Sequence, residues 1–132
     1  MAYFVLPLIT MPIKEDIKNK ADIELMIRTF YASLLTDEII KPVFVNTDFE
    51  KHMPHMIAFW SFVLLDEEGY KTNVFDKHVN LGIKEEHFEI WLSHFEKTIN
   101  DLFIGEKAEL AKLRAQTIAY TFKVKLKEMG KL

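Results

Sequence analysis

The sequence predicts an all-α protein, and three observations on its 132 residues lead to that class. Apolar residues recur at helical spacing in four long segments, and no segment alternates with the period of a β-strand. The four glycines fall near the expected helix boundaries. Hydrophobic residues make up 49% of the chain, which is enough for one packed domain. We expect this domain over residues 20–132, after an N-terminal arm over residues 1–19.

Two long helices are expected in the first half of the chain. One covers residues 21–35, and a shorter helical piece follows it and reaches about residue 45. Thr47 and Glu50 have the spacing of a capping box, which predicts the start of a helix that continues to about residue 65. Pro54 falls inside this helix, so the helix either kinks there or begins only at Pro54.

The second half of the chain carries the strongest periodic signal. FDKHVNL, residues 75–81, is long enough for a helical turn or two at most. An apolar stripe with the helical period of 3.6 residues then runs through residues 84–103. A last helix of roughly six turns is expected over residues 108–129, and Gly130 stands where a C-terminal stop belongs. The expected inventory is therefore four longer helices joined by short connectors.

Composition excludes several classes of function. The net charge of -3 offers no excess of positive charge for a nucleic acid. Cysteine is absent, which removes disulfides, thiolate metal sites and covalent haem attachment. The chain has no phosphate-binding glycine loop and neither the Glu-x-x-His nor the His-Glu-x-x-His pattern of helical metal sites. Any metal must therefore be held by histidine, by carboxylates or inside a non-covalent cofactor.

The apolar opening MAYFVLPLITMP is read as part of the arm. It lacks a basic n-region and a small-residue cleavage site, and it is shorter than the ~20 residues that span a bilayer. We expect a cytoplasmic protein with no membrane partner. The arm is expected to pack on the domain, and a contact between subunits is the alternative.

Histidines are the candidate metal ligands of a chain without cysteine. His52 and His55 form the one pair at helical spacing, but two ligands alone make a poor metal site. His87 and His94 lie beside the apolar stripe, and neither has an obvious partner in the sequence. On local grounds alone, His78 reads as a histidine that caps a loop.

Several short motifs follow one another along residues 20–128: FY at 30–31, F at 44, H at 52, FW at 59–60, KH at 77–78, HFEIWL at 87–92 and RAQTIA at 114–119. None of them is specific alone, but their order and spacing resemble the truncated haemoglobins, specifically group III. The resemblance implies a shortened globin, a two-over-two helical sandwich with a short proximal segment. It also implies a haem b bound without covalent links.

The resemblance also implies roles for individual residues. His78 matches the proximal histidine, whose ring nitrogen coordinates the haem iron. Tyr31, His52 and Trp91 match the distal residues that face the ligand. Because haem carries two carboxylates at one edge, Lys77 is a candidate for a cationic rim. The residues that would line the pocket or the core beside it are Phe44, at the haem edge, and Phe30, Met56, Trp60, Phe88 and Phe95.

The function expected from these residues is the binding of oxygen, or of nitric oxide or carbon monoxide, at a six-coordinate haem iron. Tyr31 and Trp91 would be the hydrogen-bond donors, and a reductase is a second partner to consider. The alternative is a haem redox enzyme acting on peroxide or nitric oxide, and the third hypothesis is a cofactor-free helical interaction module. Pro54 bears on His52, since a kink could swing that imidazole out of the pocket as a gate to solvent.

Overall fold

The computed structural model describes residues 13–68, 70 and 74–132, and this part of the chain is helical. It contains no strand, only one isolated bridge between Glu15 and Phe103. The predicted all-α class is therefore confirmed. The residues 1–12 of the expected arm lie outside the described residues. The helices are α2 (Lys20–Leu34), the 3-10 helix η2 (Lys41–Phe44), α3 (Phe49–Leu65), α4 (Val74–His78), α5 (Glu85–Leu102) and α6 (Glu106–Glu128).

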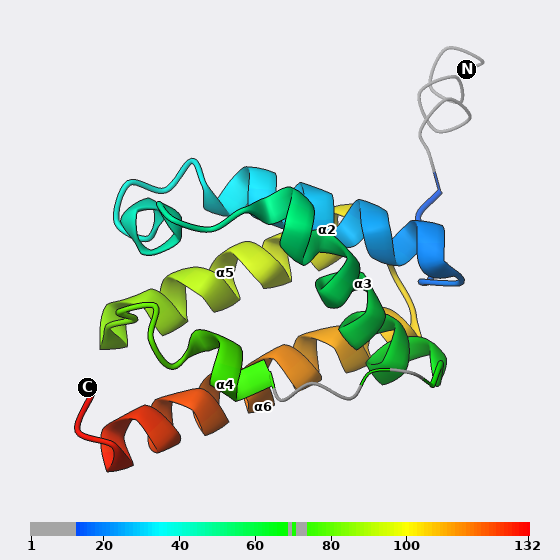
Figure 1. The fold of residues 1–132 in the computed structure, drawn as a ribbon. Coiled ribbons are helices and arrows are strands. Elements are labelled where there is room, and N and C mark those ends of the chain that lie inside the picture. Colours follow the sequence, from blue (N-terminus) through cyan, green and yellow to red (C-terminus); the bar gives the residue numbers. More distant parts are fainter. Residues whose placement is uncertain (1–12, 69, 71–73) are drawn as a thin grey trace.

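The four longer helices form two pairs. α2 packs on α3, and α5 packs on α6, while α2 with α5 and α3 with α6 make the contacts between the pairs. Figure 1 shows α2 at the top, α5 below it and α6 at the bottom, with α3 running from the level of α2 down to that of α6 and the short α4 close to α6. The predicted two-over-two sandwich is thus the observed arrangement. No helix in the described part of the chain has the length and hydropathy to cross a membrane.

The start of α3 differs from the prediction. The N-cap residue is Asp48, whose carboxylate accepts a hydrogen bond from the backbone N–H of Lys51 at 3.2 Å. The predicted capping box at Thr47 is therefore wrong by one residue, because the next side chain along the chain reaches the orphan N–H group. α3 already begins at Phe49, so the idea that it starts only at Pro54 is also wrong.

The end of α6 follows the prediction. Gly130 has a φ of 71°, the left-handed conformation that glycine adopts without a Cβ clash. Its N–H donates to the carbonyl of Lys127 at 3.0 Å, and the N–H of Lys131 donates to that of Leu126 at 2.9 Å. This hydrogen-bond pattern is a Schellman motif, which ends a helix by satisfying its last carbonyl groups.

Residues just before α2 hold the other end of α6. Both oxygens of the Asp16 carboxylate accept from the first turn of α6, from the N–H groups of Lys107 and Ala108 at 2.9 Å each. Burial of Asp16 raises its pKa, but the backbone donors outweigh this effect and leave the pKa below its ordinary value. Ile17 is 1% exposed and belongs to the core. Residues 15–17 therefore pack on the helical domain.

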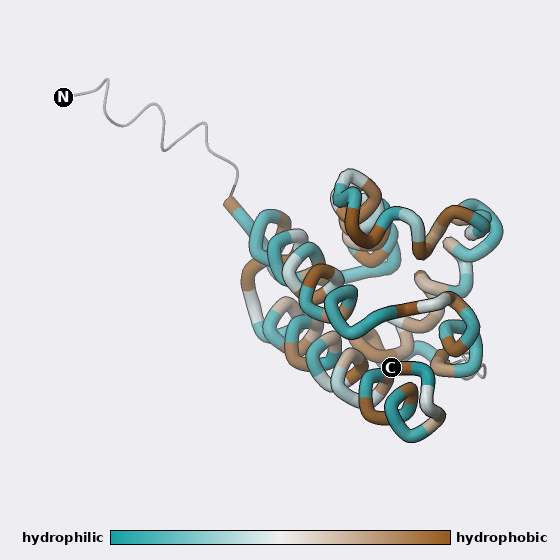
Figure 2. The backbone as a smooth tube through the Cα atoms, turned by 90° about the vertical axis from the view of Figure 1, so that its left-hand side faces the viewer, coloured by the Kyte–Doolittle hydropathy of each residue, from teal (hydrophilic) through white to brown (hydrophobic). Residues whose placement is uncertain are grey.

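An aromatic stack fills the space between the two helix pairs. Phe95 of α5 lies between Trp60 of α3, at a centroid distance of 4.9 Å, and Trp91 of α5, at 5.5 Å. Phe30 of α2 meets Phe95 edge-on at 5.3 Å. Hydrophobic and hydrophilic segments alternate along each helix in Figure 2, as expected for helices with one buried side. The stack forms the inner floor against which the pocket is built.

Candidate cofactor pocket

One large cavity lies between α3, α4, α5, α6 and the segment around η2. It encloses about 1010 Å³, including the part that opens to solvent, and most of its lining is apolar. The apolar lining suits an apolar ligand. Nine of the residues that the resemblance implies line this cavity, whereas Phe30 and Phe95 lie in the core: the nine are Tyr31, Phe44, His52, Met56, Trp60, Lys77, His78, Phe88 and Trp91.

His78 is held in one orientation by its own short helix. Its Nδ1 lies 2.7 Å from the carbonyl oxygen of Val74, one turn earlier in α4. A carbonyl can only accept, so Nδ1 carries the proton and Nε2 of the neutral ring keeps a free lone pair. The ring rests on Phe122 of α6, at a centroid distance of 5.3 Å.

The environment of His78 favours its neutral form. Burial is the main cause that lowers the pKa of His78, and the nearby His52 adds to it, while the hydrogen bond to Val74 acts in the opposite direction. A neutral imidazole with one nitrogen fixed by a backbone carbonyl and the other free is the usual state of a metal-binding histidine. His78 can therefore act as a single axial ligand to a metal in this cavity.

Tyr31 and Trp91 bring hydrogen-bond donors to the same cavity. The Tyr31 ring packs against Phe44 and Phe49, with centroids at 6.1 and 5.0 Å, and burial raises the pKa of its hydroxyl. The hydroxyl therefore stays protonated and able to donate. No hydrogen bond joins this hydroxyl or the indole N–H of Trp91 to another of the described residues, and neither atom is among the fully buried atoms without a partner. Both donors are left for a molecule in the cavity.

Two histidines of α3 line the exposed side of the cavity. His52 and His55 are three residues apart, which puts them on the same face of the helix as Met56. Both imidazoles are exposed, whereas Met56 is partly buried. Pro54 lies inside α3, yet His52 still borders the cavity and lowers the pKa of His78.

Sequence reasoning missed part of the lining. Phe122 read as an ordinary core position of the last helix, and Tyr70 gave no signal at all. His55 had one signal, its spacing of three residues from His52. These residues border the cavity because tertiary packing brings α3, α4 and α6 together around it.

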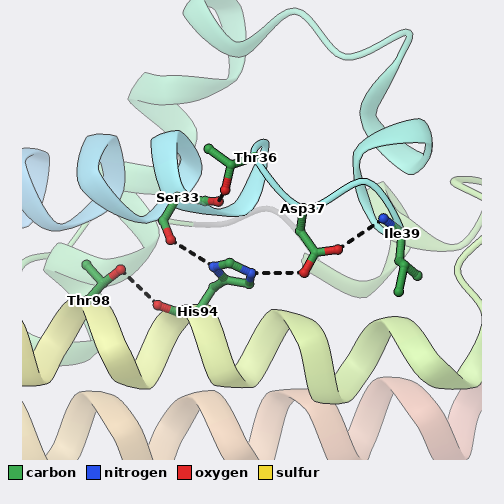
Figure 3. Close-up of polar contacts among 6 residues, drawn as sticks. All are labelled: Ser33, Thr36, Asp37, Ile39, His94 and Thr98. Atoms are coloured by element: carbon green, nitrogen blue, oxygen red, sulfur yellow. Dashed lines mark hydrogen bonds and ion pairs between the residues drawn. The ribbon is translucent and has the colours of Figure 1, made fainter.

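His87 and His94 have no obvious partner in the sequence, but both have hydrogen-bond partners in the structure. Nδ1 of His87 accepts from the backbone N–H of Lys84 at 2.9 Å. His94 lies between Ser33, 2.8 Å from its Nδ1, and Asp37, 3.2 Å from its Nε2, as Figure 3 shows. Ser33 and Asp37 lie about sixty residues away in the sequence, so their proximity arises only where α2 meets α5. We name Ser33, Asp37 and His94 the His94 cluster.

The donor set of the cavity fits a flat apolar cofactor that brings its own metal. Among the described residues, no group of three or more His, Cys, Asp or Glu could hold a metal ion by itself. One imidazole with a free nitrogen, apolar walls and the cation of Lys77 are the groups that haem needs: an axial ligand, a wall and a partner for its carboxylates.

Comparisons with known proteins agree on one family. The bacterial-like globin family matches residues 13–125 of this chain. The group 3 truncated hemoglobin ctb of Campylobacter jejuni is 30% identical over 119 residues, which cover 85% of this chain and 94% of ctb. A crystal structure of a group III truncated hemoglobin from Campylobacter jejuni is similar with a TM-score of 0.77 at 30% identity, over 86% of this chain and 95% of that one. The group 1 truncated hemoglobin GlbN of Nostoc commune is 27% identical over 81 residues, 61% of this chain and 69% of GlbN.

Proposed function

This chain belongs to the bacterial-like globin family, within it to the group III truncated haemoglobins, and from that premise we propose that it binds a diatomic gas at a haem iron. The haem would be haem b, held without covalent links. His78 would be its protein ligand, and oxygen, nitric oxide and carbon monoxide are the candidate gases that complete the six-coordinate iron.

One observation supports this proposal above the others. The free Nε2 of His78 borders the same cavity as the hydroxyl of Tyr31 and the indole N–H of Trp91, two donors without a partner in the described chain. Both side chains are partly buried and line the cavity, so a molecule bound there can supply the acceptor. One imidazole ligand would hold the haem iron, and the two donors would stabilise a bound gas.

The bound haem supplies the iron at which the gas is held. Lys77 would pair with a carboxylate of the haem, while the apolar lining residues exclude water and fix the plane of the ring. Tyr31 and Trp91 would each donate a hydrogen bond to the gas. A hydrogen bond to an acceptor with partial negative charge is worth about 1.5–3 kcal/mol, which corresponds to about ten- to hundredfold in affinity.

An absorption spectrum tests the proposal directly. The purified chain, reconstituted with haem, is expected to show a Soret band in its ferric and ferrous forms that shifts when oxygen or carbon monoxide is added. His78→Ala should lose stable haem binding, while the control His94→Gln, outside the cavity, should retain it. Normal haem retention in His78→Ala would contradict the assignment of the ligand. The absence of any Soret band in the wild type would instead favour a cofactor-free helical interaction module.

A redox enzyme is the second candidate function, and the position of His52 favours it. The exposed imidazole of His52 borders the cavity together with Tyr31 and Trp91, so it lies within reach of both solvent and a bound molecule. Turnover of peroxide or nitric oxide with a reductase or a chemical reductant would reveal this activity. It should fall in His52→Ala, and equal turnover in the variant would argue against the role of His52.

A further inference from the structure

His87 is a buried histidine of the cavity that has no role in the function proposed so far. It is the third residue of α5, and only 7% of it is exposed. Its ring lines the cavity one helical turn before Trp91. Nδ1 accepts the hydrogen bond from the Lys84 N–H at 2.9 Å, and it thereby caps the first turn of α5.

This cap determines the tautomer of His87. A backbone N–H can donate only to a nitrogen that carries a lone pair, so Nδ1 is unprotonated and the proton of the neutral ring is on Nε2. Because Nδ1 is turned back to the backbone, Nε2–H is left for the cavity that the ring lines. None of the described residues accepts a hydrogen bond from it. His87 therefore brings to the cavity a donor with a fixed orientation and no acceptor among the described residues.

We infer that the Nε2–H of His87 donates a hydrogen bond to one of the carboxylates of the haem, and so positions the cofactor from the α5 side. This inference rests on the proposed function. The carboxylates are the strong hydrogen-bond acceptors at the periphery of haem, and Tyr31 and Trp91 already serve the gas. The donor of His87 thus has one class of acceptor left within the cavity.

The charges around His87 are compatible with an anionic partner. The ring belongs to the first turn of an 18-residue helix, where the helix dipole favours negative charge. Glu85 and Glu86 are exposed and do not line the cavity, and the carboxylate of Glu85 is paired with Lys123 at 3.0 Å. The first turn therefore offers the cavity a neutral donor rather than a carboxylate.

Three substitutions separate the cap from the donor. Gln at position 87 keeps both an acceptor for the Lys84 N–H and an N–H donor, whereas Glu keeps the acceptor and removes the donor. Leu removes both. The first measurement is the rate at which haem leaves each variant for an excess of a haem-free acceptor protein. His87→Glu and His87→Leu should lose haem about tenfold faster than the wild type, the scale of one charge-assisted hydrogen bond, and His87→Gln should stay near the wild type.

The second measurement replaces haem by its dimethyl ester, in which the carboxylate charges are gone. The difference between wild type and His87→Leu should then shrink to less than about threefold, because the charge-assisted bond no longer exists. Unfolding of the haem-free proteins reports the cap separately, and there His87→Glu should be more stable than His87→Leu.

Equal rates of haem loss for the wild type and His87→Glu would overturn the inference, and so would an undiminished difference with the dimethyl ester. In both cases haem binding itself, and with it the proposed function, would stand. Failure of the wild type to bind haem would overturn the proposed function and this inference together.

Discussion

His87 and His94 lie on the same helix, two turns apart, and they differ in how many of their ring nitrogens are hydrogen-bonded to the protein. Both ring nitrogens of His94 have protein partners, Ser33 at one end and Asp37 at the other. Nδ1 of His87 accepts a hydrogen bond at the start of α5, and its Nε2 has no partner among the described residues. In sequence the two looked alike, as histidines beside an apolar stripe.

The difference separates a region whose polar atoms bond to one another from a region whose polar atoms lack partners in the protein. Around the His94 cluster the chain satisfies its own polar groups, and the result is a joint between α2 and α5 (Figure 3). Around the cavity, His78, Tyr31 and Trp91 as well as His87 each keep a hydrogen-bonding atom without a partner among the described residues. Hydrogen-bonding atoms that line an apolar cavity without protein partners are typical of a binding site.

The largest expected effect lies away from the cavity, at Gly105, beside the Asp16 carboxylate that accepts hydrogen bonds from the first turn of α6. This residue has a φ of 146°, and a Cβ added to it would lie 2.4 Å from Cγ of Asp16. Gly105→Ala should therefore lower the free energy of unfolding by roughly 2–3 kcal/mol or more, through strain and loss of the cap on α6. Urea unfolding measures it. Gly82→Ala is the control, since its added Cβ meets nothing within 4 Å and only its φ of 74° opposes the change. Equal losses in both variants would contradict the role of Asp16.

Tyr31→Phe should affect the cavity and leave the fold alone. The hydroxyl has no partner among the described residues, so the free energy of unfolding of the haem-free protein should change by less than about 0.5 kcal/mol. Oxygen should leave the haem-loaded variant roughly tenfold faster or more, as expected for the loss of one donor. Stopped-flow measurement of oxygen release gives the rate. An unchanged rate would move the donor role to Trp91 or His52.

His94→Leu is the converse test on the same helix as His87. It removes the hydrogen bond to Ser33 and leaves the Asp37 carboxylate with its hydrogen bond from the Ile39 N–H. We expect the loss of the Ser33 bond to cost about 0.5–1.5 kcal/mol of stability, with an unchanged Soret band and an unchanged rate of oxygen release. Chemical denaturation and spectra of the same sample suffice. Faster haem loss in this variant would show that the His94 cluster and the cavity are coupled, which would contradict the distinction drawn between them.

The smallest expected effect is on how the free energy of unfolding depends on pH. The hydrogen bond from His94, and after it that from the Ile39 N–H, hold the pKa of Asp37 below its ordinary value in the folded protein. The unfolded chain therefore binds the proton first as the pH falls, so the contribution of Asp37 is present above about pH 4 and is lost as the pH falls through the folded pKa. Asp37→Asn lacks this dependence. The difference in unfolding free energy between wild type and variant should shrink from pH 5 to pH 3, and a constant difference would contradict the sign.

Local patterns were enough for the helices. Burial repeats every 3.6 residues whatever lies opposite, so the stripe predicted over residues 84–103 appears as α5 at Glu85–Leu102. The short segment around His78 was likewise expected as a turn or two and is the five-residue α4. The cap of α3 was missed because Thr47 and Asp48 are neighbouring residues that both favour the N-cap position, and backbone geometry chooses between them.

The sequence by itself determined the helical inventory and, through the order of its motifs, the globin family and the residues to examine around His78. Only the tertiary structure decided which polar atoms have hydrogen-bond partners, because partners such as Ser33 and His94 meet where two helices pack together. Periodicity can be read from the sequence of one helix. Whether a donor such as the Nε2–H of His87 has an acceptor depends on all the residues that pack around it.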